Sequence, residues 1–190
     1  MGCMSPQWSM DISEWPSTSG GRPCHAAEVP TRLALDAAHC GHSRWGFQVS
    51  ADEEAFRLFK LALMHPEYVS DTIHDSAALQ NARRVRRFYC MPPGEVAALF
   101  LRELWATSLQ QAAVELRMTL DQLAQIPFHV VIGVPANWSP DVLFRLREAV
   151  SRAGIPDPRH PQSTAGFFSE PEAATLSLLK FPNPISILFP

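Results

Sequence analysis

The chain has 190 residues and a formal net charge of −3 at pH 7, and 46% of its residues are hydrophobic. That length and composition suit one globular domain with a sizeable core, and the charge does not indicate a nucleic-acid partner. No apolar run reaches the ~18 residues of a membrane span, and no signal-peptide pattern opens the chain. We therefore expect a cytoplasmic protein with free cysteine thiols, and contact with neither membrane nor nucleic acid.

The first part of the chain, residues 1–27, is rich in Pro, Ser, Gly and Cys and has no hydrophobic period. This composition predicts a loose segment, in which Ile12 and Trp15 are the residues able to dock on a folded body. Two strands are predicted next, a weak one at Arg32–Asp36 and an alternating one at Trp45–Val49.

The middle of the chain predicts helices. Ser50 and Glu53 have the spacing of a capping box, so we expect a helix from about Ala51 to Met64. A short helix is predicted at Asp71–Leu79. The basic cluster Arg83–Arg87 is interpreted as a solvated face, with contact to phosphate as the alternative.

The longest predicted helix runs from about Glu95 to Arg117, because its apolar residues fall on one side at helical spacing. Thr119 and Gln122 form a second capping-box pattern, which predicts a short helix ending near Gln125.

The run Phe128–Val134 is apolar and rich in β-branched residues, which is typical of a buried strand of a parallel sheet. Pro135 ends this strand. Ser139 is a suitable N-cap for a following helix, and Gly154 supplies its C-terminal stop.

A second strand-to-helix unit is predicted at once, with a short apolar run at Gly166–Phe168 and a helix start at Ser169–Glu172. Ligands of open α/β sheets bind beyond the carboxyl ends of the strands. If the two strands are neighbours, the turns at Pro135 and Glu170 face one crevice.

These segments resemble the ATPase domain of the seventy-kilodalton heat-shock chaperones, in particular a divergent fungal branch. The matching segments are Val134–Ser139, Ala153–Ile155 and Ser169–Ala174. The resemblance implies an α/β fold, a partial first lobe of the actin-like ATPase (ribonuclease H-like) fold with a mixed sheet and flanking helices. It divides the chain into a loose segment (1–27), the partial lobe (28–181) and a C-terminal tail (182–190).

The resemblance also implies site residues. Lys60 resembles the catalytic lysine that holds the γ-phosphate and the attacking water, and Glu170 resembles the glutamate near the metal and nucleotide. Pro135 and Ser169 fall at the cofactor-binding turns, and the implied cofactors are ATP and magnesium. The structural alternatives are a surface lysine for Lys60, helix N-terminal electrostatics for Glu170 and a strand terminator for Pro135.

The chain departs from the family pattern in two ways. Neither phosphate loop, Asp-x-Gly-Thr-Thr or Asp-x-Gly-Gly-Gly-Thr, occurs in it, and Leu143 stands where the family has the arginine that works with Pro135. Positioning of magnesium and the γ-phosphate needs both loops. Whether the chain is an enzyme therefore stays open, and we expect no efficient ATP hydrolysis by the chain alone.

Other sites have weaker support. His39, Cys40 and His42 lack the second ligand pair of a structural zinc site, so no metal site is predicted. The main functional prediction is a chaperone-like protein with an incomplete nucleotide site and with protein partners or clients. One alternative is an assembly factor, for example for a biosynthetic enzyme, that uses exposed apolar surface. Another is a truncated gene product without independent function.

Overall fold

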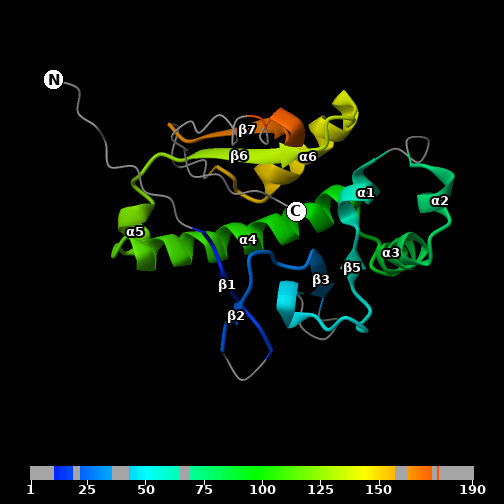
Figure 1. Cartoon of the computed structure of the whole chain (residues 1–190), viewed down its shortest axis with the longest axis horizontal. Coiled ribbons are helices and arrows are strands. Elements are labelled where there is room, and N and C mark those ends of the chain that lie inside the picture. The colour runs from blue at the N-terminus through cyan, green and yellow to red at the C-terminus, as the bar shows by residue number, and fades with distance from the viewer. Residues whose placement is uncertain are drawn as a thin grey trace.

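The computed structural model describes residues 11–18, 22–35, 43–64, 69–156, 162–172 and 175. In these ranges the strands form three small sheets, and helix α4 (Pro93–Glu115) runs between the pair β6–β7 and the antiparallel strands (Figure 1). The α/β class predicted from the sequence is confirmed. The strands of the described part lie in separate sheets, however, and not in the one mixed sheet that the resemblance implied.

The N-terminal strands form a hairpin, in which β1 (Glu14–Trp15) pairs antiparallel with β2 (Cys24–His25). Trp15 is only 5% exposed, and its indole N–H donates to the carbonyl oxygen of Ala26 at 2.8 Å. This part of residues 1–27 is therefore anchored to the core, as expected for Ile12 and Trp15, which both pack against it.

The second sheet is antiparallel with β3 (Arg32–Leu35) at its centre, between β4 (Ser43–Trp45) and β5 (Phe56–Arg57). The predicted strand Trp45–Val49 is wrong beyond its first residue, because residues Gly46–Gln48 form a 3₁₀ turn. Gly46 has φ +58°, a left-handed conformation that glycine adopts without a steric penalty.

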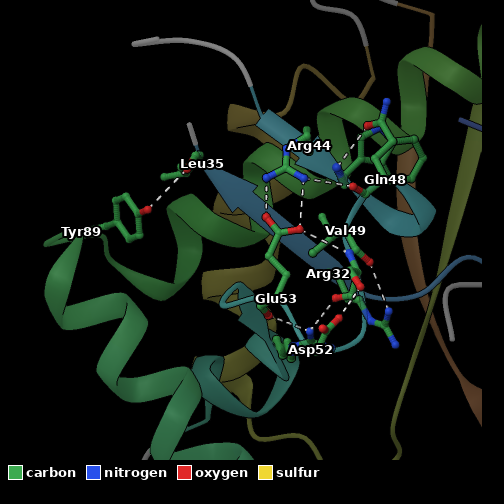
Figure 2. A network of polar contacts seen from close by, with 11 residues as sticks. Arg32, Leu35, Arg44, Gln48, Val49, Asp52, Glu53 and Tyr89 are labelled. Atoms are coloured by element: carbon green, nitrogen blue, oxygen red, sulfur yellow. Dashed lines mark hydrogen bonds and ion pairs between the residues drawn. The ribbon is translucent and has the colours of Figure 1, made fainter. Parts of the chain in front are cut away.

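The predicted helix Ala51–Met64 is also wrong, since only Phe59–Leu63, helix α1, is helical. One half of the expected capping box forms, as the Ser50 N–H donates to Glu53 Oε2 at 3.4 Å. The Ser50 hydroxyl instead contacts Asp52. The Glu53 carboxylate is not free to cap a helix, because it also pairs with the guanidinium of Arg44 from β4 (Figure 2).

Arg57 also stabilises the non-helical loop that precedes β5. Its Nη2 donates to the carbonyl oxygens of Ser50, Ala51 and Glu53 at 2.8–3.0 Å. Those oxygens would accept backbone N–H groups four residues later in a helix. Phe56 meanwhile pairs with Leu33 in the sheet and is 3% exposed, so tertiary burial overrides the local helix signal.

The segment predicted as one short helix, Asp71–Leu79, contains α2 (Asp71–His74) and the start of α3 (Ala77–Phe88). The N-cap of α3 is Ser76, whose hydroxyl accepts the Leu79 N–H at 3.3 Å. The basic cluster Arg83–Arg87 thus lies on a helix that the sequence analysis did not predict.

The two later helices are confirmed. Helix α4 matches the long predicted helix within two residues at each end, and α5 is Leu120–Leu123. Both halves of the Thr119–Gln122 capping box form, with N–H to oxygen distances of 2.8 and 3.1 Å.

The C-terminal unit consists of β6 (His129–Val134), α6 (Pro140–Arg152) and β7 (Thr164–Ser169), and the two strands pair in parallel. Gly154 has φ +79° at the end of α6, as its predicted role as a stop requires. Ser139 is the N-cap residue, but its buried hydroxyl makes no capping bond within the described structure.

Helix α4 supplies the shared core of these layers. Trp45 lies edge-on to both Trp15 and Phe100 of α4, with ring centroids 6.2 and 5.6 Å apart. On the side of β6, Trp105 of α4 contacts Phe128 at 5.5 Å. The antiparallel strands and the parallel pair are therefore fixed to the same helix, which holds the candidate site in place.

Candidate functional site

The carboxyl ends of β6 and β7 lie side by side. Val134, the last residue of β6, pairs with Ser169, the last residue of β7. The prediction of parallel neighbouring strands is confirmed, and the turns that begin with Pro135 and Glu170 consequently leave the sheet at one edge. This edge is where α/β proteins place ligands.

The turn after β6 is compact. The Trp138 N–H donates to the Pro135 carbonyl oxygen at 3.2 Å, and the Trp138 ring packs against the core. In the heat-shock chaperones that the sequence resembles, such a proline works with an arginine at the position that Leu143 occupies here. The nearest arginine, Arg145, donates from Nη1 to the Leu63 carbonyl oxygen of α1 at 3.0 Å.

The turn after β7 is a capping box. The Ser169 N–H and hydroxyl donate to Glu172 Oε2 at 3.1 and 2.6 Å, and the Glu172 N–H donates back to the Ser169 hydroxyl at 3.4 Å. These bonds lower the pKa of the Glu172 carboxyl. Ser169, predicted to bind cofactor, fixes the turn together with Glu172, whose carboxylate stabilises the start of the helix.

Lys60 and Glu170, the two predicted catalytic residues, lie together. The Lys60 ammonium is 4.0 Å from Glu170 Oε1, and the two side chains are 33% and 47% exposed. The contact joins α1 to the residue immediately after β7. Lys60 of α1 therefore lies beside the edge at which β6 and β7 end.

Local structure explains how Lys60 reaches this edge. Leu58, at φ +52°, reverses the chain between β5 and α1. Leu63, at the other end of α1, is 1% exposed and belongs to the core that α4 and α6 share. Together with the bond from Arg145 to the Leu63 carbonyl oxygen, this burial fixes the axis of α1.

The environment tunes the charge on Lys60. Partial burial lowers the pKa of its ammonium below the ordinary 10.5, and the negative charge of Glu170 opposes that shift. A desolvated ammonium beside a carboxylate can bind a phosphate oxygen, while the carboxylate orients a water molecule or a hydrated cation. The two side chains thus fit the phosphate end of an ATP–magnesium ligand.

The described residues contain no group of three or more His, Cys, Asp or Glu side chains able to hold a metal ion. His39, Cys40 and His42, which were considered as zinc ligands, lie outside the described residues, and so does the tail 182–190.

The role of Arg145 in tying α6 to α1 was not predicted from the sequence. Arg145 lies two positions after Leu143, and no local pattern indicates which group it contacts.

No helix in the described ranges has the length and apolar character of a membrane span. No protein-family model matches this chain, and no curated protein matches it.

Proposed function

We propose that this chain is a chaperone-like protein related to the heat-shock ATPases, with an incomplete site that binds a nucleotide through its phosphates and does not hydrolyse it efficiently. The observation that carries the proposal is the 4.0 Å approach of Lys60 to Glu170. Both residues occupy positions that the resemblance assigns to the nucleotide site, and they lie far apart along the chain.

The position of the pair adds support. Glu170 directly follows β7, whose last residue pairs with the last residue of β6. A phosphate placed beside Lys60 would therefore lie at the carboxyl edge of two parallel strands, the usual ligand position in α/β sheets. The lowered pKa of Lys60 reflects an incompletely solvated ammonium, which gains more from a phosphate than a fully hydrated one does.

Weak or absent hydrolysis follows from what the sequence lacks. Phosphoryl transfer depends on positioning the γ-phosphate, the metal ion and the attacking water together. Lys60 and Glu170 provide one cation and one carboxylate, and neither family phosphate loop occurs in the sequence. Under the proposal, bound nucleotide acts as a ligand that favours one state of the protein in its contacts with protein partners or clients.

Calorimetric titration of the full chain with ATP and magnesium tests the proposal. We expect saturable binding that Lys60→Met weakens by about tenfold or more, because a charge-assisted hydrogen bond contributes about 1.5–3 kcal/mol. Glu170→Gln should reduce the dependence of binding on magnesium. ATP turnover should stay at the level of a buffer control.

Glu172→Gln is the matched control for Glu170→Gln. Glutamine at this position can still complete a capping box, so this variant should bind ATP like the unchanged chain. Absence of ATP binding, or binding that Lys60→Met leaves unaltered, would contradict the proposal. Turnover above the buffer control that Lys60→Met abolishes would show instead that the site is catalytic.

The alternative of an assembly factor has less support. Large exposed apolar residues occur in the described ranges, for example Phe88 on α3, Val114 on α4 and Phe144 on α6. They belong to different helices, and single exposed apolar residues are common on soluble domains. We therefore rank this function second.

A further inference from the structure

A cavity of about 320 Å³ lies between β5, α1, α3, α4 and α6. It includes neither Lys60 nor Glu170 among its lining residues, so it is separate from the edge of β6 and β7. Its volume is at the lower end of the ~300–1,000 Å³ of small-molecule sites. The chemistry of its lining indicates what it could hold.

Four arginines line this cavity: Arg57, Arg83, Arg86 and Arg145. They come from three elements, β5, α3 and α6, and Arg83 and Arg86 share one face of α3 because they are three residues apart. Within the described part of the chain, none of the lining residues is Asp or Glu. The cavity therefore gathers positive charge from segments that are distant in sequence.

Two of these arginines form hydrogen bonds to backbone carbonyl oxygens, and Arg57 is also attracted by the nearby carboxylates of Glu53 and Asp52. Arg57 donates to backbone carbonyl oxygens of the loop that precedes it, and Arg145 donates to that of Leu63. Carbonyl oxygens satisfy N–H donors without cancelling a formal charge. Arg84 differs, because it pairs with Glu54 at 2.7 Å and does not line the cavity.

The rest of the lining is apolar. Phe56, Val69, Leu79 and Val96 contribute to it, and each is less than 9% exposed. Such a surface favours the hydrocarbon part of a ligand and disfavours a small hydrated anion. Guanidinium groups around apolar walls are complementary to a molecule with one anionic end and one apolar end.

We propose that this cavity binds an anionic amphiphile, namely a medium-chain aliphatic molecule with a carboxylate or phosphate head group. The head group contacts the guanidinium groups of Arg83 and Arg86, and the aliphatic chain lies against Val69, Leu79 and Val96. Both head groups accept two parallel hydrogen bonds from one guanidinium. Neither Lys60 nor Glu170 lines this cavity, although α1 contributes to both sites.

Titration of the full chain with sodium decanoate and with decyl phosphate, followed by two-dimensional NMR, tests the proposal and distinguishes the two head groups. We expect saturable shifts at residues that line the cavity. Affinity should rise about fourfold per methylene from hexanoate to decanoate, given the free energy of about 0.8 kcal/mol for burying a CH₂ group. Acetate, inorganic phosphate and uncharged 1-decanol should bind at least tenfold more weakly than the better amphiphile.

Arg86→Gln and Arg87→Gln make a matched pair. They are adjacent on α3, but Arg86 lines the cavity, whereas Arg87 is exposed and does not line it. We expect Arg86→Gln to weaken amphiphile binding about tenfold and Arg87→Gln to change it less than twofold. Thermal melts of both variants establish that each is folded. Val69→Phe, which fills the apolar side, should weaken binding without removing a charge.

Three results would overturn the proposal. The first is no saturable binding of either amphiphile. The second is equal binding of decanol and decanoate, which would make the site purely apolar. The third is equal loss in the Arg86 and Arg87 variants, which would indicate general attraction of anions to α3.

Discussion

The ammonium of Lys60 and the carboxylate of Glu170 lie 4.0 Å apart and join α1 to the end of β7. Both side chains are partly exposed, and ion pairs of this kind contribute only about 0–1 kcal/mol to stability. Burial also lowers the pKa of Lys60, because the fold removes part of the water that stabilises its charged ammonium. Removal of the pair should therefore have little effect on stability, which separates that effect from the proposed role in binding.

Lys60→Met should therefore leave the melting temperature unchanged or raise it, while ATP binding weakens by about tenfold or more. The folded-state pKa of Lys60 lies below its ordinary value of 10.5, so the unfolded chain holds more protons between those two values. In that window the stability of the unchanged chain should rise with pH, and the variant should lose this contribution. Melts from pH 7 to pH 10.5 measure it. A drop in melting temperature of Lys60→Met at pH 7 would indicate a structural ion pair.

Glu53→Gln should destabilise the loop between η1 and β5 in a pH-dependent way. The hydrogen bond from Arg44 holds the pKa of the Glu53 carboxyl below its ordinary 4.5 (Figure 2). The resulting stabilisation is present above pH 4.5 and is lost as the pH falls through the lower folded-state value. We expect a cost of about 0.5 kcal/mol at pH 7 for this half-exposed pair. Melts of both proteins should converge towards pH 3, and a difference that persists there would exclude titration of Glu53 as the cause.

The sequence predicted the C-terminal half of the structure well. The capping box at Thr119 and the left-handed Gly154 are local signals, and β6 carries an apolar run that has no competing signal. Even the parallel pairing followed, because a strand, a helix and a second strand in succession have few possible arrangements. Lys60 and Glu170 were selected only through the family resemblance, and their contact depends on tertiary packing.

The first half was predicted poorly for a physical reason. The Ser50–Glu53 pattern is a helix signal, but Arg44 and Arg57 compete for the same carboxylate and carbonyl groups. Both arginines reach them through the antiparallel sheet, whose pairings local patterns do not reveal. The cavity arginines were missed likewise, since Arg57, Arg86 and Arg145 come together only in the folded chain.

Two glycines provide a graded test of the backbone. Gly46 and Gly154 both have positive φ, at +58° and +79°. A Cβ on Gly46 would lie 2.5 Å from Val29 Cγ2, whereas a Cβ on Gly154 would meet nothing within 4 Å. We expect Gly154→Ala to cost about 1 kcal/mol from conformation alone, and Gly46→Ala to cost about 2 kcal/mol or more because Val29, 5% exposed, must also move. Urea denaturation of both variants measures this order, and equal costs would contradict the close contact.

Arg145→Met should loosen α1 without unfolding the protein. The hydrogen bond from Arg145 Nη1 to the Leu63 carbonyl oxygen, 3.0 Å long, ties α6 to α1. Its loss should lower the free energy of local opening of α1 by about 1 kcal/mol, which corresponds to roughly fivefold faster amide exchange in residues 59–64. Hydrogen exchange followed by mass spectrometry measures this rate on a peptide that covers α1.

Arg147→Met is the control for that experiment, since Arg147 lies on the same helix and packs over the ring of Phe167, 5.4 Å from its centroid. It should leave exchange in α1 unchanged. Because α1 carries Lys60, Arg145→Met should also weaken ATP binding by a few-fold, while the Lys60 side chain itself is retained. Faster exchange in α1 with unaltered ATP affinity would mean that the position of Lys60 does not control the nucleotide site.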